Sequence, residues 1–306
     1  MNRILEFENI SRAYKQGVPV LNGASFSMDQ GEVAGLVGRN GSGKTTLLRI
    51  AMGMLYPQDG RVRVFGLSPT EDPVAAKKRI GYVAEDQVLP NGMSVAELVA
   101  LHRSLFPKWD AAMERDLLDR FGLSPRERIK RLSKGQKRQV ALMLALCHRP
   151  ELLILDEPAG GLDPAARREF LEASIQLLNR EGSAILFSSH HMGDIERIGG
   201  RVLLLDEGRI RLDCELDRVR EDLCVAMVPK AWMESGALEK TPGCLRVRPV
   251  SDDWHAVFQG APEEVQEQLR APLGSRGVQC VRVPLEELFV ELVGGKAGKE
   301  GAWSGA

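Results

Sequence analysis

The order of apolar and polar residues predicts strands that alternate with helices. Residues 1–30 alternate apolar and polar positions around turn residues at 17–19 and 22–23, which predicts an antiparallel sheet. Short apolar runs typical of buried strands follow at residues 32–37, 60–66, 80–83, 152–155 and 184–188. Because helical segments separate several of these runs, the predicted core is a mainly parallel sheet of an α/β fold.

Helical periodicity is clearest between two of these strands. Apolar residues recur at helical spacing from Ser94 to Phe121, with Pro107 as the break, and again from Arg138 to Cys147. A shorter helix is predicted at 46–52, directly after the strand at 32–37. We therefore expect a helical subdomain at about 88–147 inside a first domain that covers residues 1–213.

The chain after about residue 214 has a different organisation. Its patterns predict strands at 244–250, 254–259 and 278–283 and helices at 263–269 and 285–292. We expect these elements to form a small α+β accessory domain at 214–293. The last residues, 294–306, are rich in glycine and lysine, and this composition predicts a disordered tail.

Composition narrows the function classes. The 306 residues carry 41 Lys and Arg against 42 Asp and Glu, a net charge of −1, which argues against a general nucleic-acid surface. The five cysteines form no C-x-x-C pair, so we expect free thiols in a reducing cytosol. The chain shows no apolar leader, and its apolar run at 140–147 is far shorter than the ~20 residues that span a bilayer. We expect a soluble protein, or one held at a membrane by a partner.

One loop carries a phosphate-binding sequence. Residues 38–45 read G-R-N-G-S-G-K-T, the full G-x-x-x-x-G-K-[ST] pattern, between a predicted strand and a predicted helix. Glycines let successive backbone N–H groups curl around an anion, Lys44 reaches the β- and γ-phosphates, and the Thr45 hydroxyl can bind Mg²⁺. The predicted phosphate site comprises Gly38, Arg39, Asn40, Gly41, Ser42, Gly43, Lys44, Thr45 and Thr46.

Two apolar runs end in the same acidic pair. Asp156-Glu157 and Asp206-Glu207 both lie at a predicted strand end, which is where α/β proteins place ligands. Gly208 follows the second pair and predicts a hairpin turn there, so we assign the site to the first pair. Asp156 is then expected to hold Mg²⁺, and Glu157 to orient or deprotonate the attacking water.

The segment Leu132–Gln136 lies between these two motifs. Ser133 and Gln136 have the S-x-x-Q spacing of a capping box before a helical run. This is the pattern of an ordinary helix start, but a helix N-terminus also favours an anion. The position of this segment between a phosphate loop and an acidic strand end favours an anion site over an ordinary helix start.

Together these segments resemble the nucleotide-binding subunit of an ATP-binding cassette (ABC) transporter, over about residues 4–212 and in the expected order. Leu132–Gln136 is similar to the family signature, residues 161–163 to the segment after the acidic strand, and Ser188–His190 to the switch histidine. The resemblance implies a P-loop NTPase fold and two subunits that bind ATP head to tail. It also implies that nucleotide is contacted by Ser133, Lys134, Gly135 and Gln136 of the partner and by Asp163.

Two residues depart from the family pattern. Lys134 occupies a position that is usually glycine, and Glu85 stands where the family has glutamine. Glutamate still accepts Mg²⁺ or water, so Glu85 is a candidate metal ligand with Thr45 and Asp156, and Gln87 is the alternative. The basic residues near the signature fit either phosphate attraction or a solvated face, and we favour the solvated face for most of them; they are Arg126, Arg128, Lys130, Arg131, Lys137 and Arg138.

Two single residues complete the predicted site. Tyr14 stands where the family stacks an aromatic residue on adenine, and the alternative is a strand aromatic packed on the core. His190 ends a predicted strand, where it can contact the γ-phosphate or hold Glu157 and water, and His191 is the competing candidate. Adjacent strand residues point to opposite sides, so at most one serves, and the family match selects His190. The predicted catalytic set is Glu157, His190 and Lys44.

The resemblance implies hydrolysis of ATP with Mg²⁺, which drives a separate integral membrane permease. The second subunit is another copy of the chain or a homologous ATPase, and the expected location is the cytoplasmic face of the cell membrane. The single cassette and the C-terminal extension resemble the bacterial exporter branch. The alternatives are a soluble cassette ATPase that acts on ribosomes or DNA, and a slow-turnover ATP-binding regulatory subunit. The near-neutral charge disfavours the first alternative, and no nucleic acid is expected as a partner.

Overall fold

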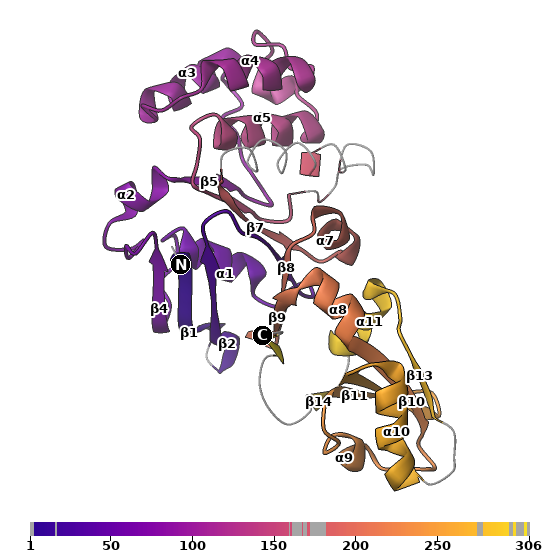
Figure 1. Ribbon diagram of the computed structural model, residues 1–306. Helices are drawn as coiled ribbons and strands as arrows, with labels where there is room; N and C mark the ends of the chain where they lie inside the picture. The colour runs from indigo at the N-terminus through magenta and orange to yellow at the C-terminus, as the bar shows by residue number, and fades with distance from the viewer. Residues whose placement is uncertain are drawn as a thin grey trace. The chain divides into compact units, whose positions relative to one another are not determined.

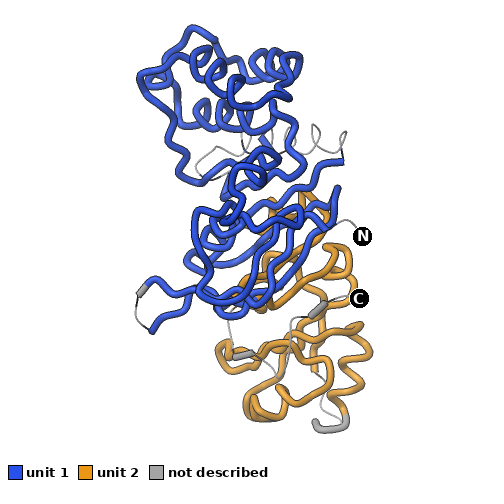
Figure 2. The backbone as a smooth tube through the Cα atoms, turned by 90° about the vertical axis from the view of Figure 1, so that its left-hand side faces the viewer, with its two compact units in different colours: residues 1–190, 207–209 blue, residues 191–206, 210–306 orange. Residues whose placement is uncertain are grey.

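The computed structural model describes residues 3–15, 17–158, 160, 167, 170–171, 182–273, 278–293, 296–297 and 303–304. The chain divides into two compact units, which Figure 2 shows in different colours. Unit 1 comprises residues 1–190 and 207–209, and unit 2 comprises residues 191–206 and 210–306. The expected domain boundary at residue 213 stays a prediction.

Unit 1 contains antiparallel and parallel strands (Figure 1). The antiparallel sheet is built from β1 (Arg3–Lys15), β2 (Val18–Asp29) and β4 (Asp59–Val64), in the order β2-β1-β4. The parallel strands are β3 (Val33–Val37), β5 (Ile80–Val83), β6 (Leu152–Leu155) and β7 (Ala184–Ser189), in the order β3-β7-β6-β5. Because parallel strands end at one edge of a sheet, the segments after β3, β5, β6 and β7 bring the predicted site residues together.

One predicted turn is wrong. Asn22-Gly23 lies inside β2, where the register shifts from Ile10 opposite Ala24 to Ser11 opposite Asn22. Gly23 adopts φ +77°, and its N–H donates to Ser11 Oγ over 3.0 Å. The extra glycine therefore forms a β-bulge within the strand, because it tolerates the positive φ that a bulge requires.

The helices of unit 1 that the structure describes are α1 (Lys44–Ala51), α2 (Pro73–Lys77), α3 (Val95–Leu105), α4 (Ala111–Arg120), the 3₁₀ turn η1 (Ile129–Arg131) and α5 (Lys134–Leu146). The helices predicted in unit 1 are present as α1, as α3 with α4, and as α5, which begins four residues earlier than predicted. Ser94 and Glu97 form a capping box at the start of α3, and Asp110 caps α4, so Pro107 lies in the break between them as predicted. Figure 1 shows α3, α4 and α5 gathered at one end of the unit.

Unit 2 starts with α7 (Met192–Ile198), β8 (Arg201–Asp206), β9 (Arg209–Glu215) and α8 (Leu216–Asp222). An antiparallel sheet with its helices follows, comprising β10 (Leu223–Pro229), α9 (Ser235–Leu238), β11 (Cys244–Val250), β12 (Asp253–Gln259), α10 (Pro262–Leu273), β13 (Gln279–Val281), α11 (Leu285–Val293) and β14 (Lys296–Ala297). Within the segment 294–306, for which a disordered tail is predicted, β14 pairs with β11 and β15 (Trp303–Ser304) pairs with β9. None of the helices that the structure describes is long and apolar enough to cross a bilayer.

The second acidic pair is part of a hairpin, as predicted. Glu207 and Gly208 lie between β8 and β9 with φ +49° and +74°, the left-handed conformations that a tight hairpin turn uses. Asp206 is buried and pairs with Arg246 Nη2 of β11 over 3.1 Å. This carboxylate therefore has a structural partner within unit 2.

Candidate active site

The phosphate loop connects β3 to α1 through glycines in unusual conformations. Gly41 and Gly43 adopt φ +85° and +108°. A Cβ atom at Gly43 would lie 2.9 Å from both Leu21 Cδ2 and the Val20 carbonyl oxygen, so this position requires glycine. Gly43 also precedes α1 without a side-chain cap, which leaves backbone N–H groups of the first helical turn for an anion.

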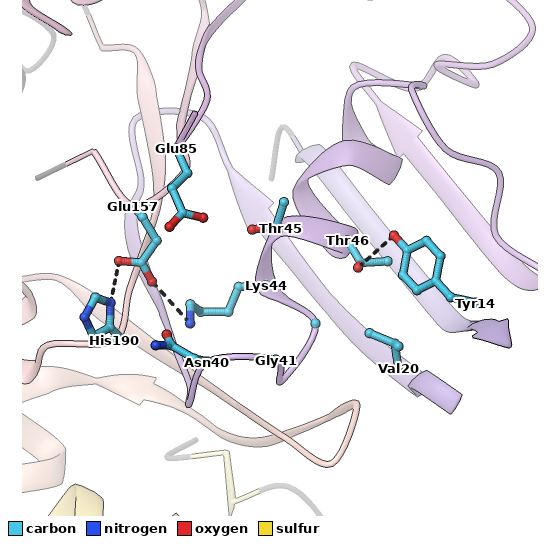
Figure 3. A pocket seen from close by; sticks show the side chains of 11 residues that line it. Tyr14, Val20, Asn40, Gly41, Lys44, Thr45, Thr46, Glu85, Glu157 and His190 are labelled. Atoms are coloured by element: carbon cyan, nitrogen blue, oxygen red, sulfur yellow. Dashed lines mark hydrogen bonds and ion pairs between the residues drawn. The ribbon is translucent and has the colours of Figure 1, made fainter. Parts of the chain in front are cut away.

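Lys44 is buried beneath this loop, with only 6% of its side chain exposed. Its Nζ donates to the Gly38 carbonyl oxygen over 2.8 Å and lies 3.2 Å from Glu157 Oε1. The second contact is an ion pair without hydrogen-bond geometry, since Glu157 Oε1 accepts no hydrogen bond from the described residues. Glu157 therefore balances the buried charge of Lys44 at the place where the phosphates are expected (Figure 3).

Asp156 follows β6 and collects hydroxyl groups from two other segments. Its Oδ1 accepts hydrogen bonds from Thr45 Oγ1 over 3.1 Å and from Ser188 Oγ over 2.8 Å. Burial raises the pKa of Asp156, and the two hydroxyl donors act in the opposite direction. Its buried Oδ2 has no hydrogen-bond partner in the described part of the chain. An unpartnered carboxylate oxygen beside a threonine hydroxyl fits Mg²⁺, which prefers oxygen ligands.

Glu157 has an unusual backbone conformation that is held by its neighbours. Its φ is +46°, a value that costs a non-glycine residue free energy and often marks functional sites. Its N–H donates to Ser188 Oγ over 2.9 Å, and its carbonyl oxygen accepts from Gly160 N–H over 3.1 Å. Glu157 Oε2 lies 2.8 Å from His190 Nδ1, and Figure 3 shows the carboxylate between His190 and Lys44.

The residues around the loop line a cavity of about 440 Å³, a size that suits a small ligand. The lining residues are Tyr14, Val20, Asn40, Gly41, Gly43, Lys44, Thr45, Thr46, Glu85, Glu157 and His190. All of these residues except Val20 belong to the site predicted from the sequence. Of the competing histidines, His190 lines this cavity, whereas His191 is exposed at the start of α7.

Glu85, and not Gln87, is directed at the cavity. Figure 3 shows the Glu85 carboxylate on the same side as Thr45 and Glu157. The Gln87 side chain instead accepts a hydrogen bond from the Ala84 N–H over 3.1 Å. The residue that departs from the family pattern is therefore the one at the candidate metal site.

Tyr14 lies at the other end of the cavity. Its side chain is 53% exposed and does not pack in the core. Its hydroxyl lies 3.1 Å from Thr46 Oγ1, and the Arg12 guanidinium lies 5.3 Å from the ring centre. Val20 lines the same end of the cavity (Figure 3). An exposed aromatic face beside an apolar side chain suits a stacked purine.

The signature segment begins α5 and is absent from the cavity lining. Gln136 N–H donates to Ser133 Oγ over 3.1 Å, and Ser133 N–H donates to Gln136 Oε1 over 2.9 Å, so the predicted capping box is confirmed. Ser133 and Lys134 are exposed, and Gly135 and Gln136 are half-buried. Asp163 lies outside the described residues.

Two further residues, Ser188 and Arg138, support the site and were not predicted to do so from the sequence. Ser188 bonds both Asp156 and Glu157, and its position near the end of β7, two residues before His190, is the signal for a shared face. Arg138 belongs to the basic residues for most of which a solvated face is favoured, but it is 4% exposed. The solvated-face interpretation does not hold for Arg138, because α5 places it on the buried side with Ala141 and Leu142, three and four residues further along.

The phosphate loop, the parallel sheet and the acidic strand end define a P-loop NTPase. Residues 21–160 match the family model described as ABC transporter. YtrB of Bacillus subtilis is 28% identical over 96% of this chain and 99% of its own length, and the Nod factor export ATP-binding protein I of Rhizobium etli is 32% identical over 95% and 93%. A solved structure of the ATP binding subunit of an ABC transporter has a TM-score of 0.65 and 30% identity, covering 71% of this chain and 92% of that one. The chain belongs to the ATP-binding proteins of the ABC transporter family, which confirms the predicted resemblance, fold and ATPase class.

Proposed function

We propose that two copies of this chain, bound head to tail, hydrolyse Mg²⁺-bound ATP and drive a membrane permease that exports its substrate. The observation that carries this proposal is the position of Glu157, in contact with both Lys44 and His190 at the wall of the phosphate-loop cavity. A general base must lie within reach of both the phosphate and a water molecule, and this arrangement meets that need.

In the proposed reaction the loop amides and Lys44 hold the phosphates. Thr45 and Asp156 would hold Mg²⁺, with Glu85 as a further ligand, and the metal would neutralise phosphate charge. Phosphate entry exchanges the Lys44–Glu157 ion pair for a Lys44–phosphate contact, which leaves Glu157 Oε1 available to water. Glu157 then accepts a proton from the water that attacks the γ-phosphorus, while His190 holds the Glu157 carboxylate in position. The bond between the γ-phosphorus and the oxygen that it shares with the β-phosphate breaks, and ADP leaves with the electron pair of that bond.

The position of the signature segment supports the head-to-tail dimer. Ser133 and Lys134 are exposed at the start of α5 and do not line the cavity of their own chain. The start of this helix, rich in N–H groups, is therefore available to the γ-phosphate bound by a second subunit. The partner that we propose is another copy of the chain or a homologous ATPase.

The relatives support the export assignment and the membrane location. The Nod factor export ATP-binding protein I aligns with nearly the whole chain, including the C-terminal extension. Exposed apolar side chains after Glu85 also suit a protein partner, since Val88 is 86% exposed and Leu105 of α3 is 58% exposed. We propose that a permease holds this subunit at the inner face of the cell membrane.

The proposed cassette covers residues 1–213, and residues 214–293 form its accessory domain.

Replacing Tyr14 tests the nucleotide orientation. Tyr14→Ala is expected to raise the KM for ATP by about 5–150-fold, because base stacking is worth about 1–3 kcal/mol. Tyr14→Phe keeps the ring and loses only the contact with Thr46, so its KM is expected to stay close to that of the wild type. Steady-state ATPase kinetics measure both values, and equal KM values for the alanine and phenylalanine variants would contradict stacking.

Co-purification tests the permease partner. The tagged chain is purified from detergent-solubilised native membranes, and the accompanying proteins are identified by mass spectrometry. We expect an integral membrane protein with several spans, in stoichiometric amounts. Recovery from the soluble fraction with ribosomal or DNA-bound proteins would overturn the transport proposal and support the soluble alternative. Tight ATP binding without turnover would support the regulatory alternative.

A further inference from the structure

Arg138 is a buried cation in the second turn of the signature helix. It lies five residues after Ser133 and is 4% exposed. Its Nη2 donates to the Glu85 carbonyl oxygen over 2.9 Å, and its Nη1 donates to the carbonyl oxygens of Pro158, over 3.2 Å, and Gly160. One guanidinium therefore bonds backbone atoms from two segments far apart in the sequence.

Both segments carry residues of the proposed site. Glu85 follows β5 and lines the cavity. Pro158 and Gly160 follow Glu157 directly, and Gly160 N–H bonds the Glu157 carbonyl oxygen over 3.1 Å. The position of Arg138 thus constrains the backbone on either side of the cavity from a helix that itself begins with the signature.

We propose that Arg138 is a positioning residue that fixes Glu85 and the turn after Glu157 relative to the signature helix. It acts through these backbone contacts and does not touch the nucleotide. The inference rests on the proposed roles of Glu85 and Glu157 in hydrolysis. When the signature engages the nucleotide of the partner subunit, Arg138 connects that contact to the cavity of its own subunit.

The chemistry of the contact requires arginine. A planar guanidinium presents several N–H donors in a fixed fork and can reach carbonyl oxygens on two sides at once, whereas an ammonium is a single point on a flexible stem. Burial lowers the pKa of Arg138, and the carboxylates of Glu85, Asp86 and Glu157 act in the opposite direction. The retained positive charge therefore also lies in the field of three acidic groups at the site.

ATPase kinetics of Arg138→Met and Arg138→Lys test this inference. Methionine keeps an apolar stem without donors, and we expect its kcat per ATP-binding site to fall about 10–100-fold, the scale of a small misplacement of catalytic groups. The KM for ATP is expected to stay within about twofold of the wild-type value, since the contacts with the phosphates and with the adenine ring are unchanged. Lysine is expected to restore part of the lost kcat. The matched control is Arg120→Met on α4, an exposed arginine in the same subdomain, with expected wild-type kinetics.

The outcomes separate this inference from the proposed function. Wild-type kcat in Arg138→Lys and in folded Arg138→Met would overturn the positioning role while the ATPase assignment stands. If the total ATPase activity and the number of ATP-binding sites fall by the same factor, kcat per site is unchanged. This result would show that Arg138 has a purely structural role and would also overturn the positioning role. If Arg138→Met does not fold, the kcat of Arg138→Lys decides alone. Absence of hydrolysis by the wild-type chain with its permease would instead contradict the proposed function.

Discussion

Substitution of Glu157 by glutamine is expected to lower the kcat for ATP hydrolysis by about 10²–10⁴-fold, the contribution of a general base. Glutamine keeps the shape and the contact distance to His190 but cannot accept a proton from water. ATP binding is expected to remain, because Lys44 and the loop amides are unchanged. Dimers with trapped ATP should therefore accumulate, and size-exclusion chromatography with ATP and Mg²⁺ measures them.

The chain contains a matched control for this substitution. Glu207 occupies the same place in the second acidic pair and also has a positive φ, of +49°, but it is exposed in the turn between β8 and β9. Glu207→Gln is expected to hydrolyse ATP at the wild-type rate and to form no trapped dimer. Normal hydrolysis by Glu157→Gln, or equal losses in both variants, would show that the base lies elsewhere.

Substitution of Lys44 by methionine is expected to abolish ATP binding at micromolar nucleotide. Charge-assisted hydrogen bonds are worth about 1.5–3 kcal/mol each, so the loss of two predicts a Kd for ATP raised by about 10²-fold or more. The free energy of unfolding should also fall, because the buried Glu157 loses its cation, and breaking such a pair costs about 3–5 kcal/mol. Nucleotide titration and urea denaturation measure the two effects.

A double variant separates these two effects of Lys44. In Lys44→Met/Glu157→Gln no charge is left at the pair, so most of the lost unfolding free energy should return while ATP binding stays weak. This result would show that the destabilisation comes from an unpaired carboxylate. Additive losses of stability in the double variant would contradict the ion pair, and retained ATP affinity in either variant would contradict the phosphate role of Lys44.

Much of this site could be predicted from the sequence, because its segments carry local patterns. The phosphate loop has fixed glycine spacing, and Asp156-Glu157 follows a continuous apolar strand. The second acidic pair was separated correctly by the glycine after it, which enters a hairpin turn. In each case the residues of the motif lie within a few positions of one another, so their spacing in the sequence is enough to identify the motif.

Features that depend on packing between distant segments were not predicted. Arg138 is as basic as the exposed residues near it in the sequence. Its helical spacing to Ala141 and Leu142 places it on the buried side of α5, but its contacts with Glu85 and Pro158 form only in the folded chain. The dipeptide Asn22-Gly23 by itself predicts a turn, but the pairing of β2 with β1 makes it a bulge. The helix α8 has seven residues, too few for a clear helical period, so it was missed. Pairing of β14 and β15 with other strands is likewise invisible in a glycine-rich sequence.

Mixing two inactive subunits decides whether the signature acts on the partner's ATP. Ser133→Arg blocks the signature but keeps the phosphate loop, and Lys44→Met/Glu157→Gln blocks the loop but keeps the signature. Each alone should be inactive, whereas a mixed head-to-tail dimer has one intact site, so random pairing predicts about a quarter of wild-type ATPase activity. Activity recovered on mixing, in dimers isolated through two different tags, is the expected result. Isolated mixed dimers without activity would contradict a site shared between subunits.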